Sequence, residues 1–307
     1  MQAQYADVLA LSGLRREHLV CPVFVSERQQ VEVSAMPGMP IVPVGCIAGR
    51  VQEIADAGIP SIILFGIPKS RNGDGSGAQD GVVQHAVREI KSAFGRSIDI
   101  ITDVCLCQYN LSGHCGIIKN GSVDNDSTIS ALAQIATSHA DAGADIVAPS
   151  AMMDGQVRAI RDALDYNGHS IRILSYSAKH ASSLYTPFRS AAFAKKGAID
   201  KSSYQVSYAN PKQAMREMAQ DIEEGADMVM VKPGLAYLDL VRRAKEQFSA
   251  PVAVQNVSGE YAMIKAAARR GWIDEEQWKI ASIAAMRRAG ADRIISYFAL
   301  DVARHLQ

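Results

Sequence analysis

The chain has 307 residues, of which 48% are hydrophobic and 21% charged, and its 32 basic residues balance its 32 acidic residues. This composition is typical of a soluble globular protein, and the even charge argues against nucleic acid or an anionic membrane surface as main partner. No stretch approaches ~20 uninterrupted apolar residues, and the start lacks the basic-then-apolar pattern of a signal peptide. We therefore expect a cytoplasmic protein that acts on a small molecule.

The first eighteen residues precede the first apolar run, and we expect residues 1–18 to form a short N-terminal arm. No linker of the kind that separates domains follows them. Residues 19–307 are therefore expected to form one domain.

Short apolar runs alternate with stretches suited to helices along this domain. A short repeat that contains Gly58, Gly143, Gly225 or Gly290 precedes four of the runs, which is typical of a helix ended by glycine and followed by a buried strand. The alternation predicts an α/β protein, a single parallel (β/α)8 TIM barrel. The eight runs span residues 19–25, 61–65, 98–104, 146–149, 171–176, 228–231, 251–257 and 293–297.

An open doubly wound sheet is the alternative fold. The Gly-rich stretch at residues 72–77 follows a strand but lacks the phosphate-binding pattern of that fold. We expect it to be a mobile surface loop.

The third apolar run ends in a cluster of cysteines at Cys105, Cys107 and Cys115. In an extended chain the first two side chains point to the same face, and Gly113 lets the loop return with the third. Three thiolates suit zinc and leave a fourth position open, which is typical of a catalytic zinc site. The alternative is that the cysteines are small buried hydrophobic residues.

Barrel enzymes carry their catalytic groups at the carboxyl ends of the strands, where this sequence places Asp103, Lys179 and Lys232. Burial lowers the pKa of Lys232, and Lys179 nearby would lower it further, so that a neutral amine can form a Schiff base with a carbonyl. The alternative is that each lysine pairs with a carboxylate such as Asp103 or reaches solvent.

The stretch at residues 186–209 is too long for a plain strand-to-helix connection. We expect it to be irregular and to form a lid over the active site.

Four motifs in order resemble the porphobilinogen synthase (delta-aminolevulinic acid dehydratase) family, in its zinc-dependent form. The resemblance runs from about Leu19 to the C-terminus, and it implies a β/α barrel. It also implies a lyase that condenses two 5-aminolevulinate molecules into porphobilinogen, with loss of two waters, in tetrapyrrole and heme biosynthesis. The motifs are Asp103–Cys107 with Gly113–Gly116, Ser175–Lys179, Met230–Gly234 and Val257–Tyr261.

By this resemblance, Lys232 would form the Schiff base with the first-bound substrate, and Lys179 would engage the second. The three cysteines would hold a catalytic zinc that orients the second substrate or a hydroxide, with Asp103 assisting proton movement. The residues that would hold the substrate carboxylates are Ser258 and Tyr297 for one substrate, and Arg189 and Lys201 on the lid for the other.

The sequence also departs from the family pattern. Ala151 replaces an Asp, Gln156 an Arg and Gln255 a Tyr. The N-terminal arm, which embraces a neighbouring barrel in family octamers, is shorter than usual, so we expect a homo-oligomer, octameric or smaller. Glu217 matches a glutamate that binds an allosteric magnesium in many members.

Two other functions stay open at this point. One is a class I aldolase-like barrel that uses only Lys232 and has structural cysteines. The other is a divergent paralogue that binds substrate or metal without turnover, which the changes at Ala151 and Gln255 would fit.

Overall fold

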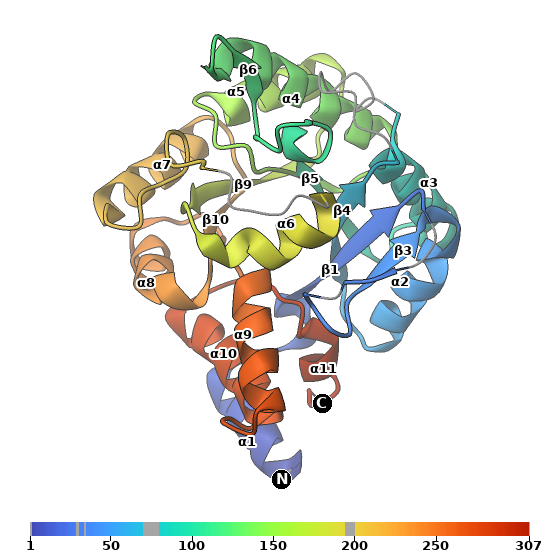
Figure 1. The fold of residues 1–307 in the computed structure, drawn as a ribbon, viewed down its shortest axis with the longest axis vertical. Helices are drawn as coiled ribbons and strands as arrows, with labels where there is room; N and C mark the ends of the chain where they lie inside the picture. The colour runs from blue at the N-terminus through green and yellow to red at the C-terminus, as the bar shows by residue number, and fades with distance from the viewer. Residues whose placement is uncertain (1, 29–30, 34, 70–79, 194–199, 307) are drawn as a thin grey trace.

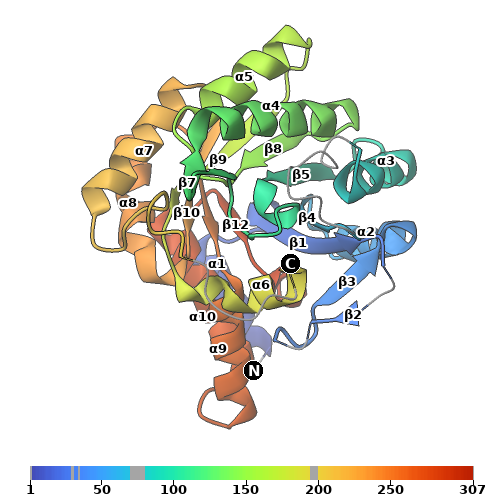
Figure 2. The ribbon, with the colours of Figure 1, turned by 45° about the horizontal axis from the view of Figure 1, so that its top comes forward.

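The computed structural model describes residues 2–28, 31–33, 35–69, 80–193 and 200–306. Eight strands pair in parallel, each with the next along the chain, and the last pairs with the first to close a barrel (Figures 1 and 2). All eight match the predicted apolar runs, so the (β/α)8 prediction is confirmed. The strands are β1 Leu19–Ser26, β4 Ser61–Ile67, β5 Asp99–Val104, β8 Ile146–Pro149, β9 Arg172–Lys179, β10 Met228–Lys232, β11 Val252–Gln255 and β12 Arg293–Ile295.

Amphipathic helices surround the barrel and bury their apolar faces against it. In the third copy of the repeat the Asn210 side chain caps its helix, as its position before Pro211 predicts. Gly58 and Gly290 of the repeat have φ of 74° and 113°, the left-handed conformation that ends a helix. The helices are α2 Ile47–Asp56, α3 Val82–Phe94, α4 Asn125–Asp141, α5 Gln156–Tyr166, α7 Pro211–Glu223, α8 Leu238–Gln247, α9 Ser258–Arg269, α10 Glu275–Ala289 and α11 Ala299–Ala303.

The aspartate that ends three copies of the repeat has the same structural role each time. Asp145 accepts hydrogen bonds from the Lys91 ammonium and from the backbone N–H of Ile100, at the amino end of β5. Asp227 and Asp292 repeat this at the amino ends of β9 and β11. Each joins a preceding helix to a strand. The ion pairs are Lys91–Asp145 at 2.7 Å, Arg161–Asp227 at 3.1 Å and Lys245–Asp292 at 2.8 Å.

The predicted irregular lid is partly wrong, because it begins with a helix, α6 Thr186–Phe193. Figure 1 shows α6 lying across the front of the strands. Pro187 lies in its first turn, where proline favours the start of a helix, and this was the sequence feature that indicated α6. Residues 194–199 of the expected lid, and the Gly-rich stretch at 72–77, lie outside the described residues.

Two pairs of short strands were not predicted. One pair, β2 Val31–Glu32 and β3 Pro40–Pro43, extends the sheet beside β1. The other, β6 Ile117–Lys119 and β7 Ser122–Asp124, is a separate hairpin. Both lie outside the closed barrel, so they leave its strand order unchanged.

The first residues form helix α1, Gln2–Ser12, which packs against α10 of the same chain. Tyr5 makes an edge contact with the His305 ring and hydrogen-bonds Asp274. α1, α9 and α10 lie together at the lower end of Figure 1.

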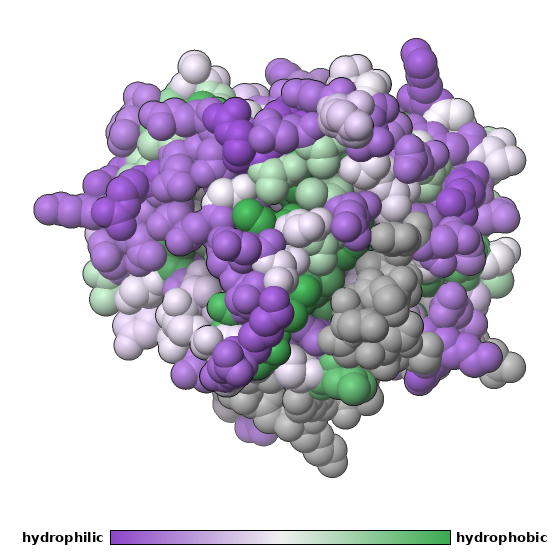
Figure 3. Space-filling view, turned by 90° about the horizontal axis from the view of Figure 1, so that it is seen from above, coloured by the Kyte–Doolittle hydropathy of each residue, from purple (hydrophilic) through white to green (hydrophobic). Residues whose placement is uncertain are grey.

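None of the described helices has the length and apolar character needed to cross a membrane. The face seen in Figure 3 is mostly hydrophilic, with hydrophobic residues gathered near its middle.

Candidate active site

A cavity at the carboxyl ends of the strands brings together most of the predicted site residues. It lies under α6 and is reached from β5, β9, β10, β11 and the segment after α6. Eight of the ten predicted substrate, catalytic and zinc residues line it, and the other two, Asp103 and Cys105, are buried. The wall consists of Cys107, Cys115, Lys179, Tyr185, Phe188, Arg189, Lys201, Gln205, Lys232, Gln255, Val257, Ser258 and Tyr297.

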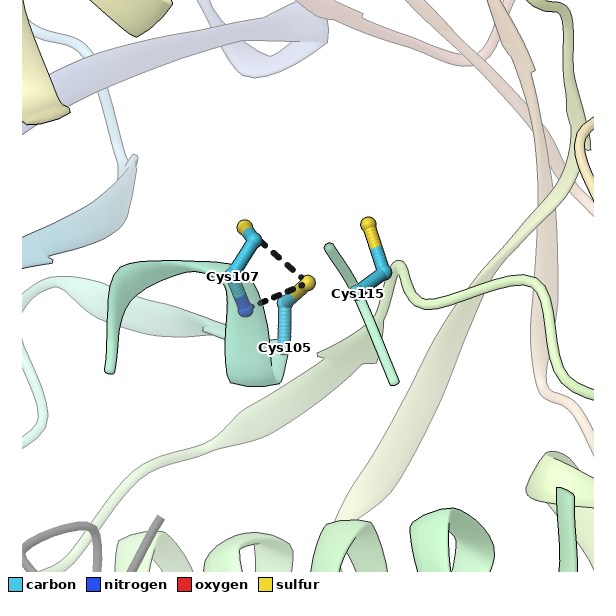
Figure 4. Close-up of side chains that lie close together, drawn as sticks. All are labelled: Cys105, Cys107 and Cys115. Atoms are coloured by element: carbon cyan, nitrogen blue, oxygen red, sulfur yellow. Dashed lines mark hydrogen bonds between the residues drawn. The ribbon is translucent and has the colours of Figure 1, made fainter. Parts of the chain in front are cut away.

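The three cysteines meet at one edge of this cavity. The sulfurs of Cys105, Cys107 and Cys115 all lie within 4.8 Å of one another, and the Cys105 and Cys107 sulfurs are 3.1 Å apart (Figure 4). Thiolates bound at ~2.3 Å to one tetrahedral zinc are roughly 3.8 Å apart. The donor set and its spacing therefore fit a zinc ion.

The reason predicted for this clustering is wrong in one respect. Cys105 is extended, but Cys107 lies in a short 3-10 turn, η4 Leu106–Gln108, rather than in an extended chain. The turn folds the Cys107 sulfur back onto Cys105, whose Sγ accepts a hydrogen bond from the Cys107 backbone N–H. Gly113, with φ of 72°, allows the return of the loop to Cys115, as predicted.

The charges around the cysteines favour one thiolate. Hydrogen bonds from Cys105 and Cys107 hold the pKa of the Cys115 thiol well below its usual value, and the nearby Lys201 charge lowers it further. The same hydrogen bonds and burial raise the pKa of Cys105. Lys201 Nζ donates to Cys115 Sγ at 3.1 Å. The predicted carboxylate-binding lysine therefore contacts the thiol cluster.

Lys179 and Lys232 occupy paired positions on β9 and β10, as predicted. Both amines lie over the Tyr176 ring, at 5.6 and 4.9 Å from its centroid. Burial lowers the pKa of the Lys232 amine to about 7, and the Lys179 charge contributes to the shift while Asp103 opposes it. At neutral pH a large fraction of Lys232 is therefore an unprotonated nucleophile.

The predicted alternative, a lysine held by a carboxylate, does not describe Lys179. Its Nζ donates to the backbone oxygen of Ser150 at 2.5 Å. Burial raises the pKa of Asp103, although the charges of Lys179 and Lys232 act in the opposite direction. A buried carboxyl with a raised pKa beside two amines is suited to hold and release a proton.

Three of the predicted carboxylate-binding residues, Ser258, Tyr297 and Arg189, line the cavity away from the cysteines, on or near α9, β12 and α6. Ser258, the first residue of α9, accepts a hydrogen bond from the Phe188 N–H and donates to the Leu184 carbonyl, both at 3.1 Å. Tyr297 stacks on Phe24, with ring centroids 6.0 Å apart. Arg189 of α6 is buried within the same cavity.

The contact between α6 and α9 is unusually close at Gly259. A Cβ atom placed on Gly259 would lie 2.6 Å from the Leu184 backbone. Only a residue without a side chain lets the turn before α6 approach α9 to this distance.

Two polar residues of the cavity wall, Tyr185 and Gln205, were not predicted from the sequence. The Tyr185 hydroxyl donates to the His180 carbonyl at 2.8 Å and lies 3.3 Å from the Lys232 carbonyl oxygen, which fixes the backbone beside Lys232. Both polar atoms of the Gln205 amide are buried with no partner in the described chain. Neither residue lies at a strand end, and no spacing in the sequence distinguishes them from surface residues.

Three other positions noted in the sequence, Glu217, Gln156 and Ala151, are not part of this cavity wall. Glu217 and Gln156 line a wider groove beside the cavity, together with Asp154, and Gln205 reaches both hollows. Burial raises the pKa of Glu217, and Asp154 adds to the shift. Ala151 is fully buried.

Comparisons with known proteins agree with this geometry. The family model for delta-aminolevulinic acid dehydratase matches residues 2–305. The delta-aminolevulinic acid dehydratase of Archaeoglobus fulgidus is 47% identical, over 96% of this chain and 92% of its own. That of Halalkalibacterium halodurans is 46% identical, over 99% and 94%.

A solved structure indicates the same family. The delta-aminolevulinic acid dehydratase (porphobilinogen synthase) of Toxoplasma gondii, in complex with the reaction product porphobilinogen, superposes with a TM-score of 0.90. The two chains are 39% identical, and the alignment covers 95% of this chain and 85% of the other.

Proposed function

The chain belongs to the delta-aminolevulinic acid dehydratase family, and we propose that its reaction takes place in the cavity lined by Lys179 and Lys232. Its activity is that of a lyase, a porphobilinogen synthase. Two 5-aminolevulinate molecules are joined through one C–C and one C–N bond, with loss of two waters, in heme and porphyrin biosynthesis. The aldolase-like and non-catalytic alternatives are not favoured.

The pairing of two lysines on adjacent strands is the observation that carries this assignment. The neutral Lys232 amine attacks the ketone of the first substrate, and loss of water gives an imine. Lys179, one strand away, engages the ketone of the second substrate. Asp103 is placed to move protons between these groups, since its carboxyl is buried and its pKa is raised.

The direct test is incubation of the purified protein with 5-aminolevulinate and a colour assay for the pyrrole. Borohydride should also trap the substrate on the peptide that contains Lys232, detected by mass spectrometry. Absence of pyrrole with the metal-loaded protein would contradict the assignment.

We propose zinc as the metal of the three cysteines. When bound, zinc would supply Lewis-acid chemistry for orienting the second substrate, and three thiolate ligands would make it a milder Lewis acid than an imidazole site. Cys105, Cys107 and Cys115 would hold it, and the low pKa of Cys115 supports a thiolate donor set.

We also propose that the substrate carboxylates are divided between two pairs of residues. Ser258 and Tyr297 would hold that of the first substrate, and Arg189 and Lys201 that of the second. All four line the cavity, which supports the division. Because Lys201 contacts Cys115, its part requires the ammonium to turn from sulfur to the substrate.

We also propose that Glu217 binds a regulatory magnesium ion. Its carboxylate lies in the wider groove, and Asp154 lies close enough to raise its pKa. Glu217→Ala should abolish any response of activity to magnesium. A variant that responds like wild type would remove this part of the proposal.

We also propose that the protein forms a homo-oligomer, octameric or smaller, and that it works in the cytoplasm. Leu11 of α1 is 89% exposed and Trp272, after α9, is 70% exposed, which supports a covered surface at this end of the molecule. Light scattering of the purified protein would give the number of subunits.

A further inference from the structure

The side chain of Gln255 carries an unexplained polar group in the active-site wall. Gln255 ends β11, is 1% exposed and lines the cavity. Its carbonyl oxygen is buried, and no donor for it is found among the described residues. An acceptor that is removed from water is costly unless something donates to it. This orphan therefore points to a donor that arrives with the ligand.

The sheet register places this amide beside the catalytic lysine. Val231 of β10 pairs with Val254 of β11, so the next position aligns Lys232 with Gln255. On its other side Lys232 pairs with Lys179. The three residues form one row across three strands, and all three line the same cavity.

The lengths of these side chains decide what the amide can reach. Neighbouring strands are about 4.8 Å apart, and aligned side chains of parallel strands point to the same face. A glutamine carbonyl extends to the level of the lysine ε-carbon. The Gln255 oxygen can therefore reach the first atoms of an adduct formed on Lys232.

We propose that Gln255 is a further substrate-binding residue, whose carbonyl oxygen accepts a hydrogen bond from the amine nitrogen of the 5-aminolevulinate held on Lys232. The amine sits on the carbon next to the imine carbon, at the end of the substrate opposite the carboxylate. The inference rests on the proposed function. It makes Gln255 a specificity residue that favours an amino ketone over the same acid without its amine.

Levulinate provides the test, because it has the ketone and carboxylate of the substrate but no amine. Equal amounts of the two ketones, in excess over zinc-loaded enzyme, are reduced with borohydride within the first turnover. The ratio of the two adducts on the Lys232 peptide is then measured by mass spectrometry.

Wild type should favour the 5-aminolevulinate adduct. Gln255→Leu should reduce that preference roughly tenfold, as expected for loss of one hydrogen bond to a charged group. Gln255→Glu, which keeps an acceptor, should retain it within about threefold. Gln255→Met is a second apolar variant of matched length, in case the Leu variant does not fold.

An adduct ratio unchanged in folded Leu or Met variants would overturn the inference, and would direct attention to Asp103 as the acceptor. A wild-type ratio near one would also overturn it, without any variant. Failure of the proposed function is distinct, since neither ketone would then be trapped on Lys232.

Discussion

The two ends of the barrel treat charge in opposite ways. At the amino ends of the strands, Asp145, Asp227 and Asp292 each have a cation from a helix and a backbone N–H as fixed partners. At the carboxyl ends, two lysines share one row, and burial lowers the pKa of Lys232 to about 7. The ion pairs at the amino ends stabilise the fold. At the carboxyl ends, we propose that the desolvated Lys232 amine is kept for chemistry at a cost in stability.

Removal of the Lys232 amine should have the largest effect on activity. Lys232→Ala should lower turnover by at least about 10⁴-fold, because loss of a covalent nucleophile is not compensated by the rest of the site. The melting temperature should hardly fall, since a desolvated amine is removed. Pyrrole formation and calorimetry measure the two effects. A variant with wild-type turnover would contradict the assignment of the nucleophile.

Removal of the metal should come next. Chelation should reduce activity on the order of 10² to 10³-fold, the usual cost of losing one electrostatic stabiliser. The fold should persist, because the three ligands belong to one strand end and its loop, whereas the core draws on all eight strands. Activity assays and circular dichroism before and after zinc is restored make the comparison. Full activity after exhaustive chelation would count against a catalytic metal.

Arg189→Ala should act on one substrate only. We expect the 5-aminolevulinate concentration that gives the half-maximal rate to rise at least about tenfold, since a charged hydrogen bond to the carboxylate of the second substrate should be lost. Trapping on Lys232 should remain largely intact, because we propose that Ser258 and Tyr297, and not Arg189, hold the first substrate. An equal loss of binding for both substrates would contradict the proposed division of carboxylate-binding residues.

The pH dependence sharpens the comparison further. Imine trapping should fall about fivefold from pH 7 to pH 6, because a Lys232 pKa of about 7 leaves less neutral amine. Lys179→Met should move the midpoint upward by removing a like charge. The unfolded chain keeps this proton up to its ordinary lysine pKa, so the free energy of unfolding should rise with pH from about 7 to about 10. A trapping rate that does not change over this range would be the contrary result.

The smallest effect belongs to the amino end of the barrel. Asp292→Asn breaks the partly exposed pair with Lys245 and should cost at most about 1 kcal/mol of unfolding free energy. Turnover should stay within about twofold of wild type. Urea denaturation and the pyrrole assay are the measurements. A large loss of activity would show that the two ends are coupled.

Much of the fold was predictable because its signals are local. The eight apolar runs and the repeated glycines are visible in the sequence and require no knowledge of distant contacts. The clustering of Lys179, Lys232 and the cysteines followed from the rule that parallel strands end on one face. The detailed roles rested on the family resemblance.

The remaining features depend on contacts between distant segments. Cys107 lies in a turn rather than a strand because the chain folds back on Cys105. Helix α6 forms where the sequence predicts an irregular loop. Gln205 reaches the cavity only through tertiary packing. Its spacing in the sequence is that of any polar residue in a loop.

The close approach at Gly259 has a mechanical consequence. Leu184 rests on this residue, and the chain then passes directly into α6 over the cavity. A single methyl group at position 259 would act as a wedge at the base of that helix. A change at position 259 would therefore alter access to the cavity by moving α6, although glycine has no side chain that could touch either substrate.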